Sequence, residues 1–230
     1  MKLIIAGIGF SDLITLRALR AAESADIILV PRANLDTEGY AERFIKELVP
    51  DKRYIQIHFP MTASAKKRDA EILSELDRVS SDLEEADTIF FPVIGDAMLY
   101  STGEYLQEAM TKLFPDIETE FIAGISAHSL AASIAKRYLA MREDILAVIP
   151  GTAPLSKIMI ALDGSDCAAI YKPSALLDIE QLADDFRVKN FGHITRVDYA
   201  GIPERENVIE GDEALKNINE YMSIILLWRD

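Results

Sequence analysis

A short apolar run in this chain ends in a glycine–aspartate pair and leads into a helical pattern. The run covers residues 88–94, the pair is Gly95-Asp96, and the helical pattern covers residues 104–113. A buried strand followed by a turn and a helix is the repeating unit of open α/β sheets. Ligands bind at such strand ends, because backbone N–H groups and helix N-termini converge there. Gly95 permits close approach of a ligand and Asp96 offers a carboxylate, although a plain turn with Asp96 as helix cap is the alternative.

Similar strand, turn and helix units precede and follow this stretch. Near the N-terminus, the apolar run of residues 2–9 ends in Gly7-Ile8-Gly9, and Ser11 or Asp12 is expected to cap the next helix. Further apolar runs predict strands at residues 27–30, 54–59, 117–122, 145–149, 168–171, 194–199 and 223–228. Helical patterns lie at residues 38–48, 65–85, 130–138, 154–162 and 175–186. Val208-Ile209 before Gly211 predicts a short antiparallel strand.

These elements predict an α/β protein with two domains, each with a mainly parallel or mixed sheet flanked by helices. The stretch of residues 123–129 combines small and hydroxyl residues before an alanine-rich helix, and we interpret it as the hinge. The expected domains are therefore residues 1–122 and 123–230. A chain of 230 residues with 50% hydrophobic residues can bury a sizeable core and is not disordered.

Composition excludes several classes of function. The net charge is −14, from 24 basic and 38 acidic residues, which argues against a nucleic-acid partner. No apolar run approaches the roughly 20 residues that a membrane span needs, so we expect a soluble, cytoplasmic protein. The single cysteine, Cys167, lies in an apolar segment and is expected to be a small buried residue, with a catalytic thiol as the alternative.

The polar residues do not suggest a metal site or a dinucleotide site. His58, His128 and His193 are far apart and lack metal-ligand spacing, so no metal is expected. Gly7-Ile8-Gly9 lacks the third glycine of a dinucleotide-binding turn, and Pro31-Arg32 stands where the ribose-binding acid belongs, which argues against NAD. His58 is interpreted as a half-buried structural histidine, with orientation of a ligand or acceptance of a proton as the alternative.

Four motifs, taken together and in order, resemble the tetrapyrrole (corrin/porphyrin) methylase family over nearly the whole chain. They are Gly7-Ile8-Gly9 with residues 12–19, residues 25–32, Gly95-Asp96, and Gly124-Ile125-Ser126-Ala127. Residues 59–62 (Phe-Pro-Met-Thr) and 100–102 (Tyr-Ser-Thr) are most similar to the branch that methylates C-20 of precorrin-2 or cobalt-factor II in cobalamin biosynthesis. The resemblance implies two α/β domains with S-adenosylmethionine as methyl donor in the cleft between them, a tetrapyrrole substrate, and usually a homodimer.

The resemblance also implies which residues form the site. The donor would contact Gly95, Asp96, Ala97, Leu99, Ser126, Ala127, Tyr171, Lys172, Tyr199 and Ala200. The macrocycle would face Asp12, Met61, Thr62 and Tyr100. The first loop is shorter than is usual in the family, and alanines replace the prolines expected at residues 97 and 123. Since the glycines and Asp96 remain, donor binding is expected to survive these changes, with a changed substrate or reduced activity as the alternative.

Methyl transfer from a sulfonium is an in-line displacement that depends mainly on positioning, which supplies roughly 7–11 kcal/mol. A reduced tetrapyrrole offers an enamine-like carbon that needs no strong base, so we expect no catalytic triad and assign no catalytic residue. Its carboxylates require nearby cations in this acidic protein, for which the candidates are Arg17, Arg32, Lys66, Lys67, Arg68 and Lys172. Arg32 is preferred because it ends a strand, whereas residues 66–68 also fit a solvated charged face.

Two other functions fit the same residues. One is another activity within the family, diphthamide or ribosomal-RNA methylation, although an RNA enzyme should be less acidic and the diphthamide enzyme should lack the turn at residues 59–62. The other is a non-catalytic module that binds a nucleotide through Gly7-Ile8-Gly9. Such a module would bind ligand without turnover.

Overall fold

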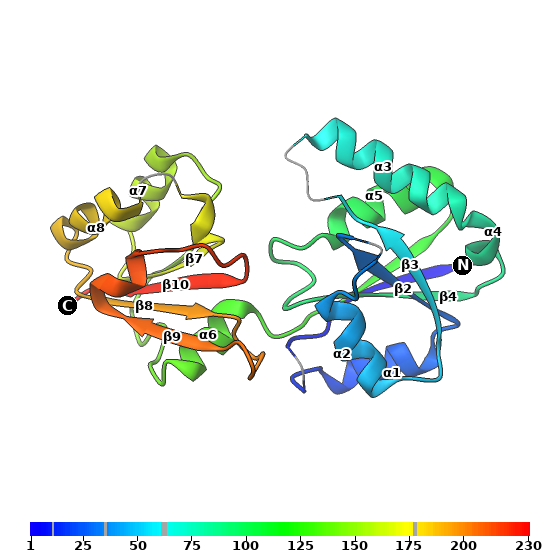
Figure 1. The fold of residues 1–230 in the computed structure, drawn as a ribbon, viewed down its shortest axis with the longest axis horizontal. Coiled ribbons are helices and arrows are strands. Elements are labelled where there is room, and N and C mark those ends of the chain that lie inside the picture. Colours follow the sequence, from blue (N-terminus) through cyan, green and yellow to red (C-terminus); the bar gives the residue numbers. More distant parts are fainter. Residues whose placement is uncertain (11, 35, 61–63, 177–178) are drawn as a thin grey trace. The chain divides into compact units, whose positions relative to one another are not determined.

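The computed structural model describes residues 1–10, 12–34, 36–60, 64–176 and 179–230, so Met61 and Thr62 lie outside the described residues. The chain divides into two compact units, Met1–Ser126 and Ala127–Asp230, each with its own sheet (Figure 1). The boundary predicted from the sequence lies a few residues earlier, after residue 122. The turn that follows residue 122 belongs to the first unit because Gly124 is hydrogen-bonded to Asp96 and lies against Gly7.

The first unit contains a five-stranded sheet in the order β3-β2-β4-β1-β5, with every pair parallel. Its strands are β1 (Lys2–Gly7), β2 (Ile27–Arg32), β3 (Arg53–His58), β4 (Thr88–Val93) and β5 (Glu118–Ile122). Because the strands are parallel, all five carboxyl ends lie at one edge of the sheet. β1 lies between β4 and β5, so the loops that follow these three strands are neighbours.

Helices cover both faces of this sheet, with α1 and α2 on one face and α3 and α5 on the other (Figure 1). The helices are α1 (Leu16–Ser24), α2 (Tyr40–Leu48), α3 (Ala65–Arg78), α4 (Ser80–Glu84) and α5 (Gly103–Leu113). Burial on both faces explains why the strands are near-continuous apolar runs in the sequence. On the α3 and α5 side the core joins strand residues such as Ile5 and Phe91 to helix residues such as Leu76 and Met110.

Two helix predictions were wrong in detail. The cap of α1 is Thr15, whose hydroxyl oxygen accepts a hydrogen bond from the Ala18 N–H at 3.2 Å, and not Asp12; Ser11 lies outside the described residues. Thr15 is the residue directly before the helix, where a side-chain oxygen reaches the free N–H groups of the first turn. The single helix expected at residues 65–85 is two helices, because the chain leaves helical geometry at Val79 (φ −110, ψ 8).

The second unit contains a five-stranded mixed sheet in the order β6-β7-β10-β8-β9. Its strands are β6 (Leu146–Pro150), β7 (Cys167–Tyr171), β8 (His193–Asp198), β9 (Asn207–Glu210) and β10 (Ser223–Trp228). β10 pairs antiparallel with β7 and β8, so β6, β7 and β8 run in one direction and end at one edge. β9 pairs antiparallel with β8, which confirms the mixed sheet and the short antiparallel strand predicted at Val208-Ile209.

Two layers of helix enclose this second sheet (Figure 1). The helical segments are α6 (Ala127–Ile134), α7 (Leu155–Asp163), α8 (Ile179–Val188) and two short 3₁₀ segments, Pro173–Ala175 and Gly211–Leu215. α7 and α8 contribute to the core on one face, whereas α6 covers the other face together with Trp228. Cys167 is buried in the α6 core, and burial raises the pKa of its thiol to about 11. The cysteine is therefore a small buried residue, as expected.

Within the described residues, none of the helices combines the length and the apolar character that a membrane-spanning helix requires.

Candidate functional site

Three turns meet at the carboxyl edge of the first sheet, where β1, β4 and β5 end side by side. The turn after β1 and the turn after β4 are joined by a pair of backbone hydrogen bonds between Gly9 and Gly95, with N···O distances of 3.2 and 2.9 Å. The Ile8 N–H also donates to the Val93 carbonyl at 3.0 Å. The two turns therefore form a continuous, hydrogen-bonded backbone surface.

The turn glycines are required for different physical reasons. A Cβ on Gly124 would lie 2.1 Å from the Gly95 carbonyl oxygen, and a Cβ on Gly7 would lie 2.5 Å from the same oxygen. These two positions have no room for a side chain because backbone lies against backbone. Gly95 has more space, since a Cβ on it would have its nearest neighbouring atom 3.7 Å away, but its φ of +77° is a conformation that favours glycine.

Asp96 joins the turn after β4 to the turn after β5. Its Oδ1 accepts a hydrogen bond from the Met98 N–H at 2.7 Å, and its Oδ2 accepts one from the Gly124 N–H at 3.0 Å. The alternative that Asp96 caps the following helix is wrong, because the residue at the N-cap of α5 is Thr102. Both carboxylate oxygens of Asp96 thus accept hydrogen bonds from backbone N–H groups, so the carboxylate links the two turns.

The first unit brings together Gly95, Asp96, Ala97, Leu99 and Ser126 from the donor set, in or beside these turns. Ala97 is only 4% exposed and belongs to the core, and Leu99 is half-buried. Ser126 is the last residue of the unit and follows the glycine turn after β5. Small and apolar residues at a strand end suit the close approach of an uncharged ligand surface.

The other residues predicted to contact the donor, apart from Ala127, lie at one edge of the second sheet. Tyr171 ends β7 and is followed by Lys172, and Tyr199 and Ala200 follow directly after β8, two strands that end at the same edge. Lys172 (φ +51°) and Tyr199 (φ +50°) both adopt the left-handed region, which is uncommon for residues other than glycine. Such conformations cost free energy and cluster at functional sites.

Ala127 is linked to this edge through its neighbour His128, which sequence reasoning had not connected with Tyr171. His128 Nδ1 and the Tyr171 hydroxyl share a hydrogen bond of 2.8 Å, and the His128 backbone N–H donates to the same hydroxyl oxygen at 3.3 Å. The rings are in an edge-to-face arrangement with centroids 6.0 Å apart. The first turn of α6 is thereby fixed against the end of β7.

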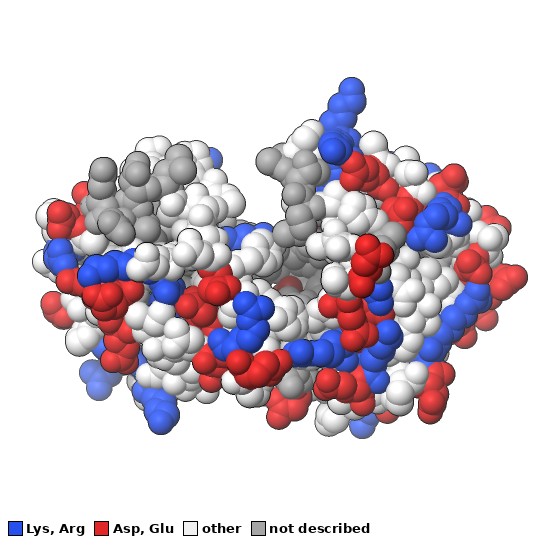
Figure 2. Space-filling view, in the orientation of Figure 1, with Lys and Arg blue, Asp and Glu red and all other residues white. Residues whose placement is uncertain are grey.

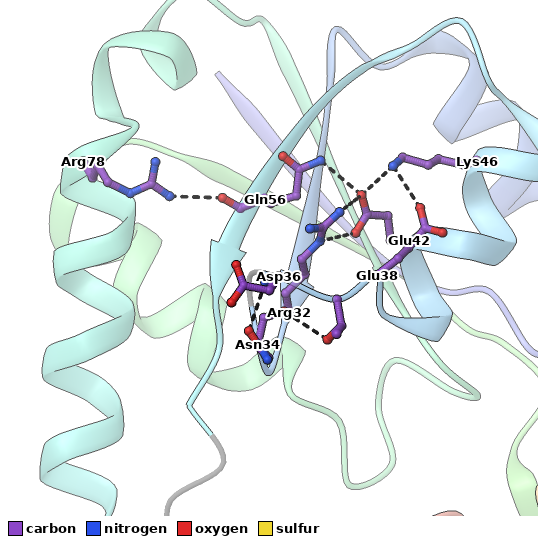
Figure 3. A network of polar contacts seen from close by, with 9 residues as sticks. Arg32, Asn34, Asp36, Glu38, Glu42, Lys46, Gln56 and Arg78 are labelled. Atoms are coloured by element: carbon purple, nitrogen blue, oxygen red, sulfur yellow. Dashed lines mark hydrogen bonds and ion pairs between the residues drawn. The ribbon is translucent and has the colours of Figure 1, made fainter.

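Arg32, the preferred partner for a substrate carboxylate, is engaged in a buried network (Figure 3). Its Nε and Nη2 donate to the two carboxylate oxygens of Glu42, at 2.5 and 2.7 Å. Glu42 is fully buried and also receives hydrogen bonds from Lys46 at 2.6 Å and Gln56 at 3.1 Å. Burial by itself would raise the pKa of Glu42, but these donors together lower it to about 2.

Glu42 is not among the residues predicted from the sequence, although its position in the sequence is a signal. Glu42 stands among the apolar residues Ala41, Phe44 and Ile45 on the buried face of α2. A carboxylate on an apolar face must be paired, and the cations within reach of its helix are Arg32 at the end of the neighbouring strand and Lys46 one turn further on. The identity of the neighbouring strand is a tertiary fact that the sequence pattern does not carry.

The other predicted residues are dispersed. Asp12 is exposed in the loop before α1, and Tyr100 is 45% exposed in the loop before α5. His58 is half-buried, and its backbone N–H donates to Glu75 at 3.0 Å. Lys66 and Lys67 are exposed at the start of α3. In the part of the chain that the structure describes, no group of three or more His, Cys, Asp or Glu side chains could hold a metal ion.

Charge is mixed over the surface. Figure 2 shows Lys and Arg side chains interspersed with Asp and Glu side chains on the visible face. Many charged side chains of the described residues are paired, for example Lys2 and Arg17 with Glu120, each at 2.6 Å. A surface of this kind does not resemble the basic stripe of a nucleic-acid-binding protein.

Several curated relatives are similar to this chain, and two of them are named for methylation at C(20) of cobalt-precorrin-2. It is 29% identical over 167 residues to the cobalt-precorrin-2 C(20)-methyltransferase of Salmonella typhimurium, a match that covers 72% of this chain and 69% of the relative. It is 27% identical over 229 residues to a Methanocaldococcus jannaschii protein named probable cobalt-precorrin-2 C(20)-methyltransferase, which covers 97% of this chain and 93% of the relative.

A solved structure and a family model are also similar to this chain. The uroporphyrin-III C-methyl transferase from Thermus thermophilus, solved in complex with S-adenosyl homocysteine, has the same fold, with a TM-score of 0.68 at 16% identity and coverage of 99% of this chain and 97% of that chain. A family model described as Tetrapyrrole (Corrin/Porphyrin) Methylases matches residues 2–215. Since that match covers most of the chain, this protein belongs to the tetrapyrrole (corrin/porphyrin) methylase family and is an S-adenosylmethionine-dependent methyltransferase.

Proposed function

We propose that this protein transfers a methyl group from S-adenosylmethionine to C-20 of precorrin-2, either metal-free or as its cobalt complex, in cobalamin biosynthesis. The observation that carries the proposal is the set of glycine turns joined by Asp96 at the carboxyl edge of the first sheet, in a chain of this family. Relatives named for C(20) methylation, one of which matches 97% of the chain, support the choice of carbon.

We propose that both units contribute to the donor site. The first unit would supply Gly95, Asp96, Ala97, Leu99 and Ser126, and the second would supply Ala127, Tyr171, Lys172, Tyr199 and Ala200. Gly95 adopts a backbone conformation that favours glycine, and Asp96 is hydrogen-bonded to both turns. The donor supplies the methyl group as a sulfonium, and the chain's part is to bind and orient it, since displacement at a methyl carbon needs alignment above all.

We further propose that Asp12, Arg32, Met61, Thr62 and Tyr100 face the macrocycle. The ion pair with Glu42 holds the Nε and Nη2 edge of the Arg32 guanidinium in place. A guanidinium has five N–H donors, and an arginine held on one edge is already ordered when the ligand arrives. Arg32→Ala should raise the KM for the macrocycle without changing the affinity for the donor, and it should also lower the Tm because the buried Glu42 loses one of its cations.

The test begins with calorimetric titration of the purified protein with S-adenosylhomocysteine, with NAD as the control ligand. Selective binding of S-adenosylhomocysteine is the expected result. An anaerobic assay should then detect the addition of one methyl group to precorrin-2, compared with and without cobalt. Binding of S-adenosylhomocysteine without methylation of either form would favour a different substrate within the family, and binding of NAD alone would contradict the proposal.

We also propose that the protein is a homodimer, as the family resemblance implies. The second unit has several exposed large apolar side chains that a partner subunit could cover, among them Ile160 (72% exposed) and Val188 (81%). Sedimentation equilibrium over a range of protein concentrations measures the mass directly. A mass of one chain, 25.6 kDa, at all concentrations would contradict this part of the proposal.

A further inference from the structure

The loop between β4 and α5 exposes two large apolar side chains within a few residues. Met98 is 66% exposed and Tyr100 is 45% exposed. Among the described residues of the first unit, the other exposed large apolar side chains are Met1, Leu16 and Leu48, which lie far apart in the sequence. Single exposed apolar residues are ordinary, whereas two in one short loop beside a ligand site suggest a contact surface.

The loop has two faces. Ala97 is 4% exposed and Leu99 is half-buried, so buried and exposed residues alternate from Ala97 to Tyr100. Ala97 belongs to the core of the first unit. Because Ala97 packs into the core, a partner that contacts this loop would meet the exposed side chains of Met98 and Tyr100.

The loop is also firmly held. Asp96 binds the Met98 N–H and the Gly124 N–H, and the Ser101 hydroxyl oxygen accepts from the Gly103 N–H at 3.0 Å. Gly103 lies so close to Ile5 that a Cβ on Gly103 would be 2.6 Å from the Ile5 Cγ2. A surface that is ordered before binding loses little entropy when a ligand arrives.

Tyr100 adopts a left-handed conformation, with φ +51°. This region is unfavourable for a residue other than glycine, and hydrogen bonds fix the loop on both sides of Tyr100. The tyrosine ring is thus placed at this point of the loop by an unfavourable backbone conformation.

We infer that Met98 and Tyr100 form an apolar platform for the face of the tetrapyrrole. This inference rests on the proposed function and adds Met98 to the residues that contact substrate. A tetrapyrrole has broad, largely apolar ring faces and carries its carboxylates at the periphery, so an uncharged platform suits the ring and leaves the carboxylates to cations elsewhere. The polarizable thioether of methionine and the ring of tyrosine both pack favourably on conjugated rings.

The first test replaces Met98 by glutamine, which keeps the length of the side chain and removes its apolar character. Met141→Gln is the matched control, because Met141 is a similarly exposed methionine (50%) in the second unit. Binding of precorrin-2 is followed anaerobically by absorbance in the absence of donor, and binding of S-adenosylhomocysteine is followed by calorimetry. We expect Met98→Gln to raise the Kd for precorrin-2 about fivefold and leave the Kd for S-adenosylhomocysteine unchanged, while Met141→Gln changes neither.

A second pair of variants tests Tyr100. Asparagine tolerates the left-handed region, so Tyr100→Asn removes the ring without forcing the backbone to change, and Tyr100→Phe keeps the ring. The first variant should weaken binding of precorrin-2 about tenfold, and the second should leave it unchanged.

Three results would overturn the platform: an unchanged affinity of Met98→Gln for precorrin-2, an equal loss of affinity for S-adenosylhomocysteine, or a change of oligomeric state in Met98→Gln, which would mean that a second copy covers this loop. Wild-type protein that fails to bind S-adenosylhomocysteine would count against the proposed function instead. The binding measurement with precorrin-2 alone still decides the platform in that case.

Discussion

The arrangement of the turns at the edge of the first sheet depends on single residues, and most of all on Asp96. Asp96→Ala leaves the Met98 and Gly124 N–H groups without their acceptor, at a cost of about 1–2 kcal/mol because water can replace part of the interaction. We predict a lower Tm and roughly tenfold weaker binding of S-adenosylhomocysteine by calorimetry.

Two further variants distinguish the structural role of Asp96 from direct binding of the ligand by its charge. Asp96→Asn keeps the shape but turns an amide NH2 toward one of the two backbone N–H groups, so it should also lower the Tm. Asp116→Ala, at an exposed aspartate in the turn before β5, is the control and should change nothing. A normal Tm with lost donor affinity in Asp96→Asn would show that the charge itself binds the ligand.

Glu42 should make the stability of the protein depend on pH. Its folded pKa of about 2 lies below the ordinary value of 4.5, so its ionised form stabilises the fold fully above about pH 4.5, and this contribution is lost as the pH falls toward 2. Glu42→Gln removes the charge that pairs with Arg32 and Lys46 in a buried site, which should cost about 3 kcal/mol at pH 7.

The measurement is the free energy of unfolding from pH 7 down to pH 3, for wild type, Glu42→Gln and the control Glu47→Gln, an exposed glutamate on the same helix. The difference between wild type and Glu42→Gln should shrink as the pH falls, while Glu47→Gln follows wild type throughout. A difference that is independent of pH would mean that the pKa of Glu42 is the same in the folded and the unfolded protein.

At the scale of the elements, the turns after β1, β4 and β5 depend on backbone lying directly against backbone. Gly124→Ala would place a Cβ 2.1 Å from the Gly95 oxygen, which must push the turns apart at a cost of about 2–3 kcal/mol. Gly164→Ala is the matched control: this glycine follows α7 with φ −93° and no atom within 4 Å of a Cβ, so alanine should stabilise by about 0.5 kcal/mol. Thermal unfolding distinguishes the two, and a Gly124→Ala variant as stable as wild type would contradict the close packing.

The elements also show what the sequence could and could not predict. The strands were predictable because a sheet covered on both faces produces unbroken apolar runs such as residues 88–94. The break at Val79 was not, because neither proline nor glycine marks it and the helical periodicity continues into α4. The pairing of Arg32 with Glu42, and of His128 with Tyr171, depends on which helix lies on which strand, and residue spacing does not contain that information.

At the scale of the whole molecule, the two units place their predicted donor residues in the same way, although their sheets differ. In each, strands that run in one direction end at one edge, and the predicted donor residues follow those ends: Gly95 and Ser126 in the first unit, Lys172 and Tyr199 in the second. In the first unit Gly9, Gly95 and Tyr100 have positive φ angles near these ends, and in the second unit Lys172 and Tyr199 do. A lysine and a tyrosine also bring side chains that can contact a ligand.

If both edges hold the donor, a single ligand should protect both units. We predict that S-adenosylhomocysteine slows amide hydrogen exchange at residues 95–99 and 124–126 of the first unit and also at residues 171–172 and 199–200 of the second, because ligand binding suppresses local opening of the segments it touches. Peptides from β9 and from the middle of α3 serve as internal controls, and NAD serves as the control ligand. Protection confined to the first unit would remove Tyr171, Lys172, Tyr199 and Ala200 from the proposed donor site and leave the turns around Asp96 as the whole of it.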